Sequence, residues 1–427
     1  MRMAETADLR RNTLWMISGH GVSLAFQAAY FILIGRTLGS HEYGAFVGVV
    51  ALVNVLSQFS SLGMEMILVR DISRARELFA AAWGNALEIS ACGFAILLAV
   101  AMLIGHFTLK QELQRLIPFV ALSDALFGKL VQLASRAFQG AGLLSQTARL
   151  TALTNISRAA FALCLFLGAT FVHLHADALL WTRIYWLSSL MTAIVAFASV
   201  TRLLGWPVFG RISMRVLIDG FSFSLSSSSI SVYNDIDKTF LVSAGQLYAA
   251  GIYSAAYRII DVASVPIYAI YTAATPRFFR EGERGIGDVS ILANRLLRRT
   301  VPYGIAAAVL LFVGSPLLPY LFGPSFRGSV DALRWLCLLP LIRGLHYAWG
   351  TTITGSSSQW YRTAMQLGAA VANLTLNALL IPRWSWRGAA IASLLTDAGL
   401  AAASWIVVQY LRAKENAQEK IAVSQVV

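Results

Sequence analysis

Charge is scarce in this chain of 427 residues, because only 13% of them are Asp, Glu, Lys or Arg. A soluble domain carries about 25% charged residues, which its water-facing surface requires. The shortage excludes a soluble multi-domain enzyme and a disordered chain. It indicates a membrane protein whose outer surface faces lipid.

Cysteine is also rare. The three cysteines, Cys92, Cys164 and Cys337, are far apart in the sequence, and each lies in an apolar stretch. This spacing excludes a disulfide scaffold and the CxxC motifs of metal or redox sites. We expect the three thiols to act as small hydrophobic side chains.

Motifs of catalysis and cofactor binding are missing as well. The chain has no P-loop, HExxH or GxSxG motif, and its histidines show no metal-ligand spacing. Asp235 and Asp237 form a DxD pair, but residues i and i+2 of a helix point about 200° apart and cannot share one metal ion. The sequence predicts no catalytic residues, no metal site and no cofactor.

Long apolar runs are abundant, and 57% of the residues are hydrophobic. A run of about 20 residues crosses the hydrocarbon core of a bilayer, and a helix satisfies its own backbone hydrogen bonds there. The sequence therefore predicts an all-α integral membrane protein of about twelve transmembrane helices. Their expected ranges are 13–35, 44–69, 79–105, 116–137, 148–172, 178–203, 217–243, 248–276, 300–322, 330–353, 359–381 and 387–411.

The net charge of +13 follows from basic residues in the connections between these runs. Lys and Arg are concentrated in alternate connections, among them 204–216 and 277–299. Such a bias orients a membrane protein with its basic connections in the cytoplasm, so we expect both termini there and no binding to nucleic acid. The sequence thus predicts a multi-pass membrane protein with both termini in the cytoplasm, surrounded by membrane lipids.

The two halves of the chain resemble each other. Aligning Gly44 with Gly251 also aligns Phe46 with Tyr253 and Arg70 with Arg277. Parallel repeats of this kind occur in transporters that rock two lobes about a central site. We expect two six-helix lobes around a central cavity. The predicted parts are an N-terminal lobe at 1–203, a cytoplasmic linker at 204–216 and a C-terminal lobe with a short cytoplasmic tail at 217–427.

Ionisable side chains inside the predicted spans are costly and rarely face lipid, so each is a functional candidate. Cations and polar groups there favour an anionic, sugar-bearing ligand. The candidates for substrate binding are Lys129, Arg158, Asn234, Lys238, Arg258, Arg343, His346 and Tyr347. The candidates for carrying a coupling ion are the acids Glu88, Asp124, Asp235 and Asp237.

Structural roles compete with these functional ones. Six serines between Ser222 and Ser229 indicate either a helix that lines a cavity or close helix packing. Asp235 and Lys238, like Arg258 and Asp261, have the i,i+3 spacing of helical ion pairs. A further group of aromatic residues could contact sugars but is more typical of an interfacial belt; it consists of Trp181, Tyr185 and Trp186.

Three stretches of the sequence resemble a known family. They are GRTLGSHEYGAF with the following SLGMEMILVRDISR, then YNDIDKTFLVSAGQLYAAGIYSAAYRI, and finally ANLTLNALLIPRWSWRGAAIASLLTD. The chain is similar over nearly its whole length to the Wzx-type polysaccharide and O-antigen repeat-unit flippases. These belong to the multidrug/oligosaccharidyl-lipid/polysaccharide exporter superfamily. One departure is Trp386, where the family has a glycine before GAA.

The resemblance implies a flippase that moves an undecaprenyl-diphosphate-linked oligosaccharide across the inner membrane by alternating access. It also implies a proton or sodium gradient as the driving force, and association with the polysaccharide polymerase machinery. The positions of this chain that match the family pattern are Asp237, Lys238, Gly251, Tyr253 and Arg258.

Two other functions remain open from the sequence. A cation-coupled multidrug exporter of the same superfamily would share the fold, but its cavity should be acidic and aromatic. A membrane glycan polymerase or ligase usually has a large outside loop with catalytic residues. The predicted spans leave no such loop, which favours a transporter without enzymatic activity.

Overall fold

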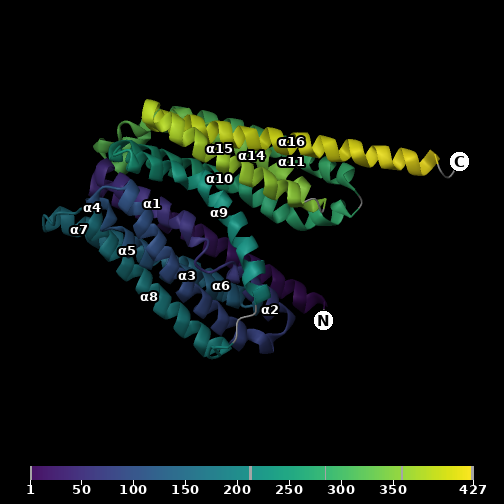
Figure 1. Ribbon diagram of the computed structural model, residues 1–427, viewed down its shortest axis with the longest axis horizontal. Coiled ribbons are helices and arrows are strands. Elements are labelled where there is room, and N and C mark those ends of the chain that lie inside the picture. Colours follow the sequence, from purple (N-terminus) through teal and green to yellow (C-terminus); the bar gives the residue numbers. More distant parts are fainter. Residues whose placement is uncertain (1, 211–213, 284, 357–358, 425–427) are drawn as a thin grey trace. The chain divides into compact units, whose positions relative to one another are not determined.

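The computed structural model describes residues 2–210, 214–283, 285–356 and 359–424, and these residues fold into helices without a β-strand (Figure 1). The first half contains α1 (Arg2–Ser57), α2 (Met64–Arg74), η1 (Arg76–Leu78), α3 (Phe79–Thr108), α4 (Gln111–Gln114), α5 (Ile117–Ala121), η2 (Leu122–Gly128), α6 (Lys129–Gly140), α7 (Leu144–Phe171) and α8 (Ala178–Leu204). The second half contains α9 (Met214–Ser243), α10 (Leu247–Gly282), α11 (Ile286–Gly314), η3 (Ser315–Leu317), α12 (Leu318–Phe322), η4 (Pro324–Phe326), α13 (Ser329–Leu336), α14 (Leu339–Gly355), α15 (Gln359–Trp384) and α16 (Trp386–Ser424).

Packing contacts divide the chain into two compact units. Unit 1 consists of Met1–Ser231, Gly245–Gly251 and Leu321–Gly323, and unit 2 of Val232–Ala244, Ile252–Tyr320 and Pro324–Val427. The division falls inside α9, so the first half of this helix packs with unit 1. The sequence predicts the boundary in the linker at 204–216, of which residues 211–213 lie outside the described part. The predicted lobe boundaries stay a prediction.

The helices account for the twelve predicted spans. Nine helices of the described residues are long and apolar enough to cross a membrane. One of them, α1, contains the first predicted span and the beginning of the second, which the sequence predicts at 44–69 and which continues past Ser57 into α2. Gly39 interrupts α1 between these two spans with φ 71° and ψ 172°, a conformation that glycine adopts without steric cost. The seventh and tenth predicted spans correspond to α9 and to α13 with α14, which are not among these nine. The helix α14 has only 17 residues.

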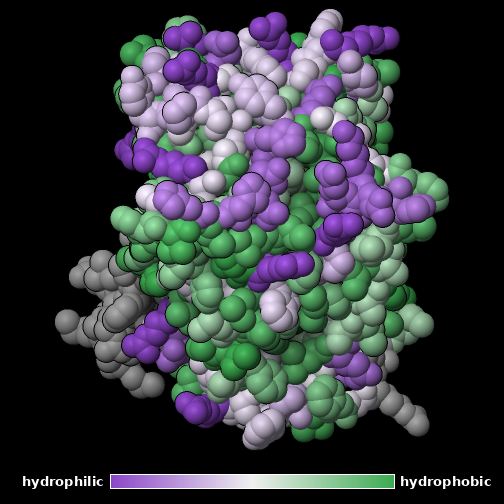
Figure 2. All heavy atoms as spheres, turned by 90° about the vertical axis from the view of Figure 1, so that its left-hand side faces the viewer, coloured by the Kyte–Doolittle hydropathy of each residue, from purple (hydrophilic) through white to green (hydrophobic). Residues whose placement is uncertain are grey.

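Large apolar side chains cover much of the outer surface. On α3, Ile96 is 68% exposed and Phe107 is 78% exposed, and on α11 Leu310 is 72% exposed. Figure 2 shows broad apolar areas on one face, with hydrophilic side chains gathered in patches among them. Apolar side chains exposed in this number need lipid around them. The chain is therefore a multi-pass membrane protein.

Each unit has its own apolar core. In unit 1, Trp83 of α3 and Phe138 of α6 are fully buried in a cluster that also includes residues of α2 and α8. In unit 2, Phe278 of α10 and Val289 of α11 are fully buried beside Ala348 of α14. These cores hold in place the helices that carry the buried charges.

Candidate functional site

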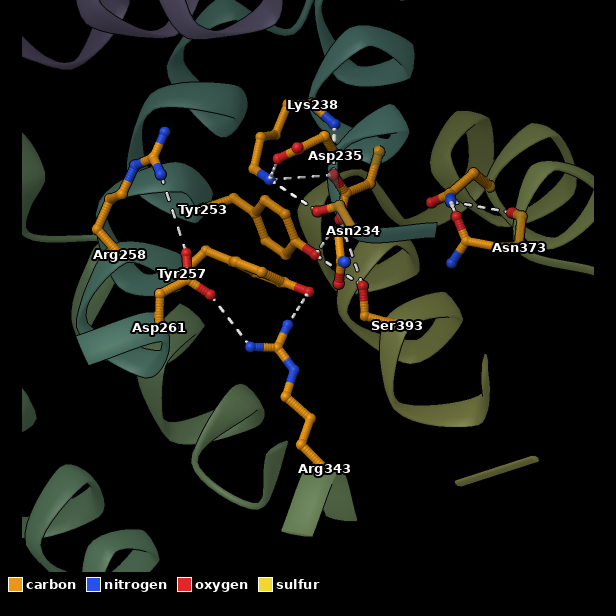
Figure 3. Close-up of polar contacts among 12 residues, drawn as sticks. Asn234, Asp235, Lys238, Tyr253, Tyr257, Arg258, Asp261, Arg343, Asn373 and Ser393 are labelled. Atoms are coloured by element: carbon orange, nitrogen blue, oxygen red, sulfur yellow. Dashed lines mark hydrogen bonds and ion pairs between the residues drawn. The ribbon is translucent and has the colours of Figure 1, made fainter. Parts of the chain in front are cut away.

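The central acid of unit 2 is Asp237 on α9, which is only 1% exposed. The Tyr253 hydroxyl on α10 donates to its Oδ2 at 2.5 Å, and Ser393 on α16 donates to the same oxygen at 3.3 Å. Tyr253 and Ser393 also lie 3.0 Å apart, oxygen to oxygen (Figure 3). Three helices thus place hydroxyl groups and one carboxylate at a single buried point.

Lys238 follows Asp237 on α9 and turns to a different set of partners. Its Nζ donates to the Asp235 carboxylate at 2.6 Å and to the Asn234 carbonyl oxygen at 2.9 Å. The same ammonium lies 4.5 Å from the ring centre of Tyr257. The predicted i,i+3 pair of Asp235 and Lys238 is confirmed. The Lys238 ammonium is also 3.8 Å from Asp237, but Tyr253 and Ser393 donate to Asp237.

Arg343 on α14 lies at the centre of a second network in unit 2. Its guanidinium contacts the Asp261 carboxylate at 3.1 Å and the Asp397 carboxylate at 3.5 Å. It also donates to the Tyr257 hydroxyl at 2.7 Å, so this phenol connects α10 to α14 (Figure 3). Asp261 pairs in addition with Arg258 at 3.9 Å, as its i,i+3 spacing predicts. Arg343 is not an isolated cation, because two acids and a phenol surround it.

His346 and Tyr347 lie one turn further along α14. His346 is 5% exposed, and its Nδ1 has no hydrogen-bond partner in the part of the chain that is described. Tyr347 packs against the Tyr268 ring edge-on at 5.8 Å between centroids. A buried imidazole nitrogen without a partner is unusual in a protein interior. His346 therefore remains a candidate for binding a ligand.

Polar side chains of α15 and α16 form a third buried group in unit 2. Asn373 donates to the Thr396 hydroxyl at 3.1 Å, and Asn377 donates to the Asn373 amide oxygen at 2.8 Å. Both asparagines are fully buried. The sequence reasoning missed Asn373, Asn377, Ser393 and Thr396 as site residues, although all four lie in the third stretch of the family resemblance.

In unit 1, Asp124 and Arg158 form a charge pair between η2 and α7. Arg158 donates to the Asp124 carboxylate at 3.0 Å, and the Tyr185 hydroxyl donates to the same oxygen at 2.5 Å. The guanidinium lies 4.6 Å from the Tyr185 ring centre. Asp124 stands in a π-helical turn, a distortion that often occurs at functional sites. The structure thus brings together one candidate acid and one candidate cation.

Lys129 has another role, because it pairs with Glu65 inside the core of unit 1. Its Nζ lies 2.8 Å from the Glu65 carboxylate, which also accepts from Ser61 at 2.8 Å. Lys129 is 5% exposed and Glu65 is 8% exposed. The pair joins α2 to α6, and Lys129 does not line the cavity described below.

Removing one partner of this pair should destabilise the protein. Lys129→Met leaves the buried Glu65 carboxylate without its cation, which costs about 3–5 kcal/mol in the free energy of unfolding. The double variant Glu65→Leu/Lys129→Met removes both charges and should recover most of that loss. Unfolding in mixed detergent micelles, followed by circular dichroism, measures both. A double variant as unstable as the single one would contradict this account of the pair.

A cavity of about 480 Å³ lies in unit 1 beside the charge pair of Asp124 and Arg158. Polar side chains of α1, α6 and α7 form most of its wall, two of them arginines. The polar lining residues are Gln27, Gln132, Ser135, Arg136, Gln139, Thr147, Thr151, Thr154, Asn155 and Arg158. Of the predicted substrate-binding residues, the wall contains Arg158.

Glu88, the fourth candidate acid, lies on α3 outside both networks. It is half-buried and makes no hydrogen bond or ion pair to any described residue.

The interpretation of the aromatic residues as an interfacial belt is wrong for Trp181 and Tyr185, which are 0% and 3% exposed. They pack with Tyr30 and Phe46 inside unit 1, and the ring of Tyr185 also contacts Arg158.

The serines of α9 are partly explained by packing. Ser224, Ser228 and Ser229 are buried, and Ser228 donates to the Val55 carbonyl oxygen of α1 at 3.2 Å. The side chains of Ser222 and Ser226 lie outside the described residues. Close packing therefore accounts for the described serines that are buried, while a cavity-lining role for α9 stays a prediction.

Solved structures with a similar fold are membrane transporters. An inward-facing multidrug resistance MATE family transporter of the MOP superfamily has a TM-score of 0.75 and 16% identity, covering 93% of this chain and 96% of its own. The lipid II flippase MurJ in an inward closed conformation has a TM-score of 0.69 and 11% identity, covering 93% of this chain and 87% of its own. A MOP superfamily transporter from Pyrococcus furiosus, described by the reverse polarity of its binding pocket, has a TM-score of 0.62 and 16% identity over 94% of this chain and 95% of its own. At these identities the likeness shows the fold, and the predicted all-α transporter fold is confirmed.

Sequence comparison adds the family. None of the curated proteins matches the chain. A family model described as "Polysaccharide biosynthesis protein" matches residues 9–281, which is more than half of the chain and includes α9 and most of α10. This membrane protein with a MOP transporter fold belongs to the polysaccharide biosynthesis protein family.

Proposed function

We propose that this protein is a flippase for an undecaprenyl-diphosphate-linked oligosaccharide, the repeat unit of a surface polysaccharide. It moves the cargo across the bacterial inner membrane by alternating access and carries out no chemical reaction. The observation that carries the proposal is the match to a polysaccharide biosynthesis family together with arginines inside both units: Arg136 and Arg158 at the unit 1 cavity, and Arg343 in unit 2. Of these, Arg136 has no acidic partner among the described residues. Cations held inside apolar surroundings attract phosphate and carboxylate groups strongly.

The cargo and the energy source follow from the same reasoning. The diphosphate and sugars pass through the protein interior while the polyprenyl chain stays in lipid. An ion gradient of H⁺ or Na⁺ drives the cycle. Asp237 is the acid best placed to carry the ion, because it is almost fully buried and its nearest cation, the Lys238 ammonium, is 3.8 Å away, farther than the Tyr253 hydroxyl at 2.5 Å. The proposal includes cytoplasmic termini, which the basic connections support, and association with the polysaccharide polymerase machinery.

Mass spectrometry of lipid-linked intermediates after deletion of this gene in its host tests the proposal. We expect one undecaprenyl-diphosphate oligosaccharide to accumulate and the matching surface polymer to disappear. Expression of the intact gene should reverse both changes. Unchanged lipid intermediates would overturn the proposal.

A multidrug exporter is the second candidate, and the fold similarity to a MATE transporter favours it. The unit 1 cavity opposes it, because its wall contains two arginines and no acid, which does not suit an organic cation. The same deletion strain separates the two functions. New sensitivity to cationic dyes with unchanged lipid intermediates would support the drug exporter. If the protein were a polymerase or ligase, its deletion would instead leave the oligosaccharide on the outer side of the membrane.

A further inference from the structure

The polar cavity of unit 1 has the character of a sugar-binding site. Its volume of about 480 Å³ lies in the range of about 300–1,000 Å³ that small-molecule sites occupy. Amide and hydroxyl side chains of three helices form the wall, and these groups both donate and accept hydrogen bonds. Sugar hydroxyls need partners of this kind.

Several of these side chains have unused hydrogen-bonding capacity. The side chains of Gln27 and Gln132 make no hydrogen bond to any residue of the described ranges. Asn155 uses its Nδ2 to donate to the Ser23 hydroxyl and the Thr151 carbonyl oxygen, which leaves its amide oxygen as an acceptor. The wall is therefore prepared for a neutral polar ligand at several points.

The charges of the cavity are not balanced. Arg158 is neutralised by Asp124 at 3.0 Å. Arg136 donates to the Gln139 amide oxygen at 2.8 Å and forms no ion pair within the described part of the chain. The charge of Arg136 is therefore uncompensated at the cavity wall, and a ligand with one negative charge would balance it. A carboxylate supplies one charge, whereas a diphosphate carries more than one.

We propose that this cavity binds an acidic sugar of the cargo, with its carboxylate on the guanidinium of Arg136 and its hydroxyls on Gln27, Gln132 and Asn155. The proposal rests on the proposed function, since it names the kind of glycan that the flippase carries. The cavity lies where α6 ends and α7 begins, a connection that the loop charges place at the cytoplasmic side. The acidic sugar binds there before translocation, on the side where the oligosaccharide is assembled.

Saturation-transfer NMR on the purified full-length protein in nanodiscs measures weak sugar binding directly. The probes are trigalacturonate and its methyl ester, which keeps the hydroxyls and loses the charges. We expect trigalacturonate to bind about tenfold more tightly than the ester, because the charge-assisted hydrogen bond to Arg136 is lost with the ester. Arg136→Gln should abolish this preference.

Two variants make the outcome specific. Arg149→Gln removes an equal charge from an exposed position of α7 outside the cavity wall and should leave binding unchanged. Gln132→Leu should weaken binding of the acid and the ester alike, which keeps the test valid if Arg136→Gln does not fold. Equal binding of acid and ester would overturn the proposal, and so would displacement of trigalacturonate by inorganic pyrophosphate at micromolar concentration. Because NMR detects binding without transport, failure here is separate from failure of the flippase function in the deletion strain.

Discussion

Replacing Arg343 by Met is expected to lower the free energy of unfolding by about 3–5 kcal/mol, because it leaves the buried Asp397 carboxylate without its cation. Asp397 is 4% exposed and lies 3.5 Å from the guanidinium, so water cannot replace the lost charge. The Tyr257 hydroxyl also loses the group that donates to it at 2.7 Å. Transport of the lipid-linked oligosaccharide should decrease together with the stability. Unfolding in mixed detergent micelles measures the first effect, and accumulation of the lipid intermediate measures the second.

The double variant Arg343→Met/Asp397→Leu separates stability from transport. Removing both charges should recover most of the unfolding free energy. Transport should stay low, because the cation that attracts the cargo is still absent. Arg383→Met is the matched control, since Arg383 is exposed on α15 and its loss should change stability by less than about 0.5 kcal/mol. Full recovery of transport in the double variant would show that Arg343 has a structural role alone.

The helices could be predicted because the bilayer imposes its thickness on the sequence. An apolar run of about 20 residues is enough to identify a spanning helix, and the helices against which it packs need not be known. How the first two spans are joined could not be predicted, because the interruption of α1 consists of one residue, Gly39, and composition does not show its conformation. Nor could the π-helical turn around Asp124, which depends on the packing of neighbouring helices.

The site could be predicted only where its partners are close in sequence. The i,i+3 pairs of Asp235 with Lys238 and of Arg258 with Asp261 follow from helix geometry. The pairing of Glu65 with Lys129 joins positions on two different helices, and no spacing rule indicates it. For the same reason Lys129 looked like a cavity cation, whereas Arg136, four residues before the end of its helix, lines the cavity.

The hydroxyl groups around Asp237 bear on ion coupling. The Asp237 carboxylate accepts from Tyr253 at 2.5 Å, from Ser393 at 3.3 Å and from the Lys238 backbone N–H at 2.7 Å. Because a carboxylate has about four lone-pair sites, it keeps capacity for a small cation or a proton. Its nearest cation, Lys238, is 3.8 Å from the other carboxylate oxygen and already pairs with Asp235. Asp235 lacks such a position, because its carboxylate holds the lysine at 2.6 Å and is partly exposed. Among the four candidate acids, Asp237 therefore fits the coupling role best.

Asp237→Asn should uncouple transport from the ion gradient. The amide keeps the shape and a hydrogen bond to Tyr253 but loses the negative charge, which weakens binding of a cation by about 10–100-fold. In proteoliposomes, an imposed proton or sodium gradient should speed flipping of the lipid-linked oligosaccharide by the unchanged protein and have no effect on the variant. Imposing each gradient separately identifies the ion. Asp288→Asn removes an exposed acid of unit 2 and should respond like the unchanged protein. A variant at Asp237 that still follows the gradient would assign coupling to another acid. Asp124 would be the next to replace, since its carboxylate accepts from both the Arg158 guanidinium and the Tyr185 phenol.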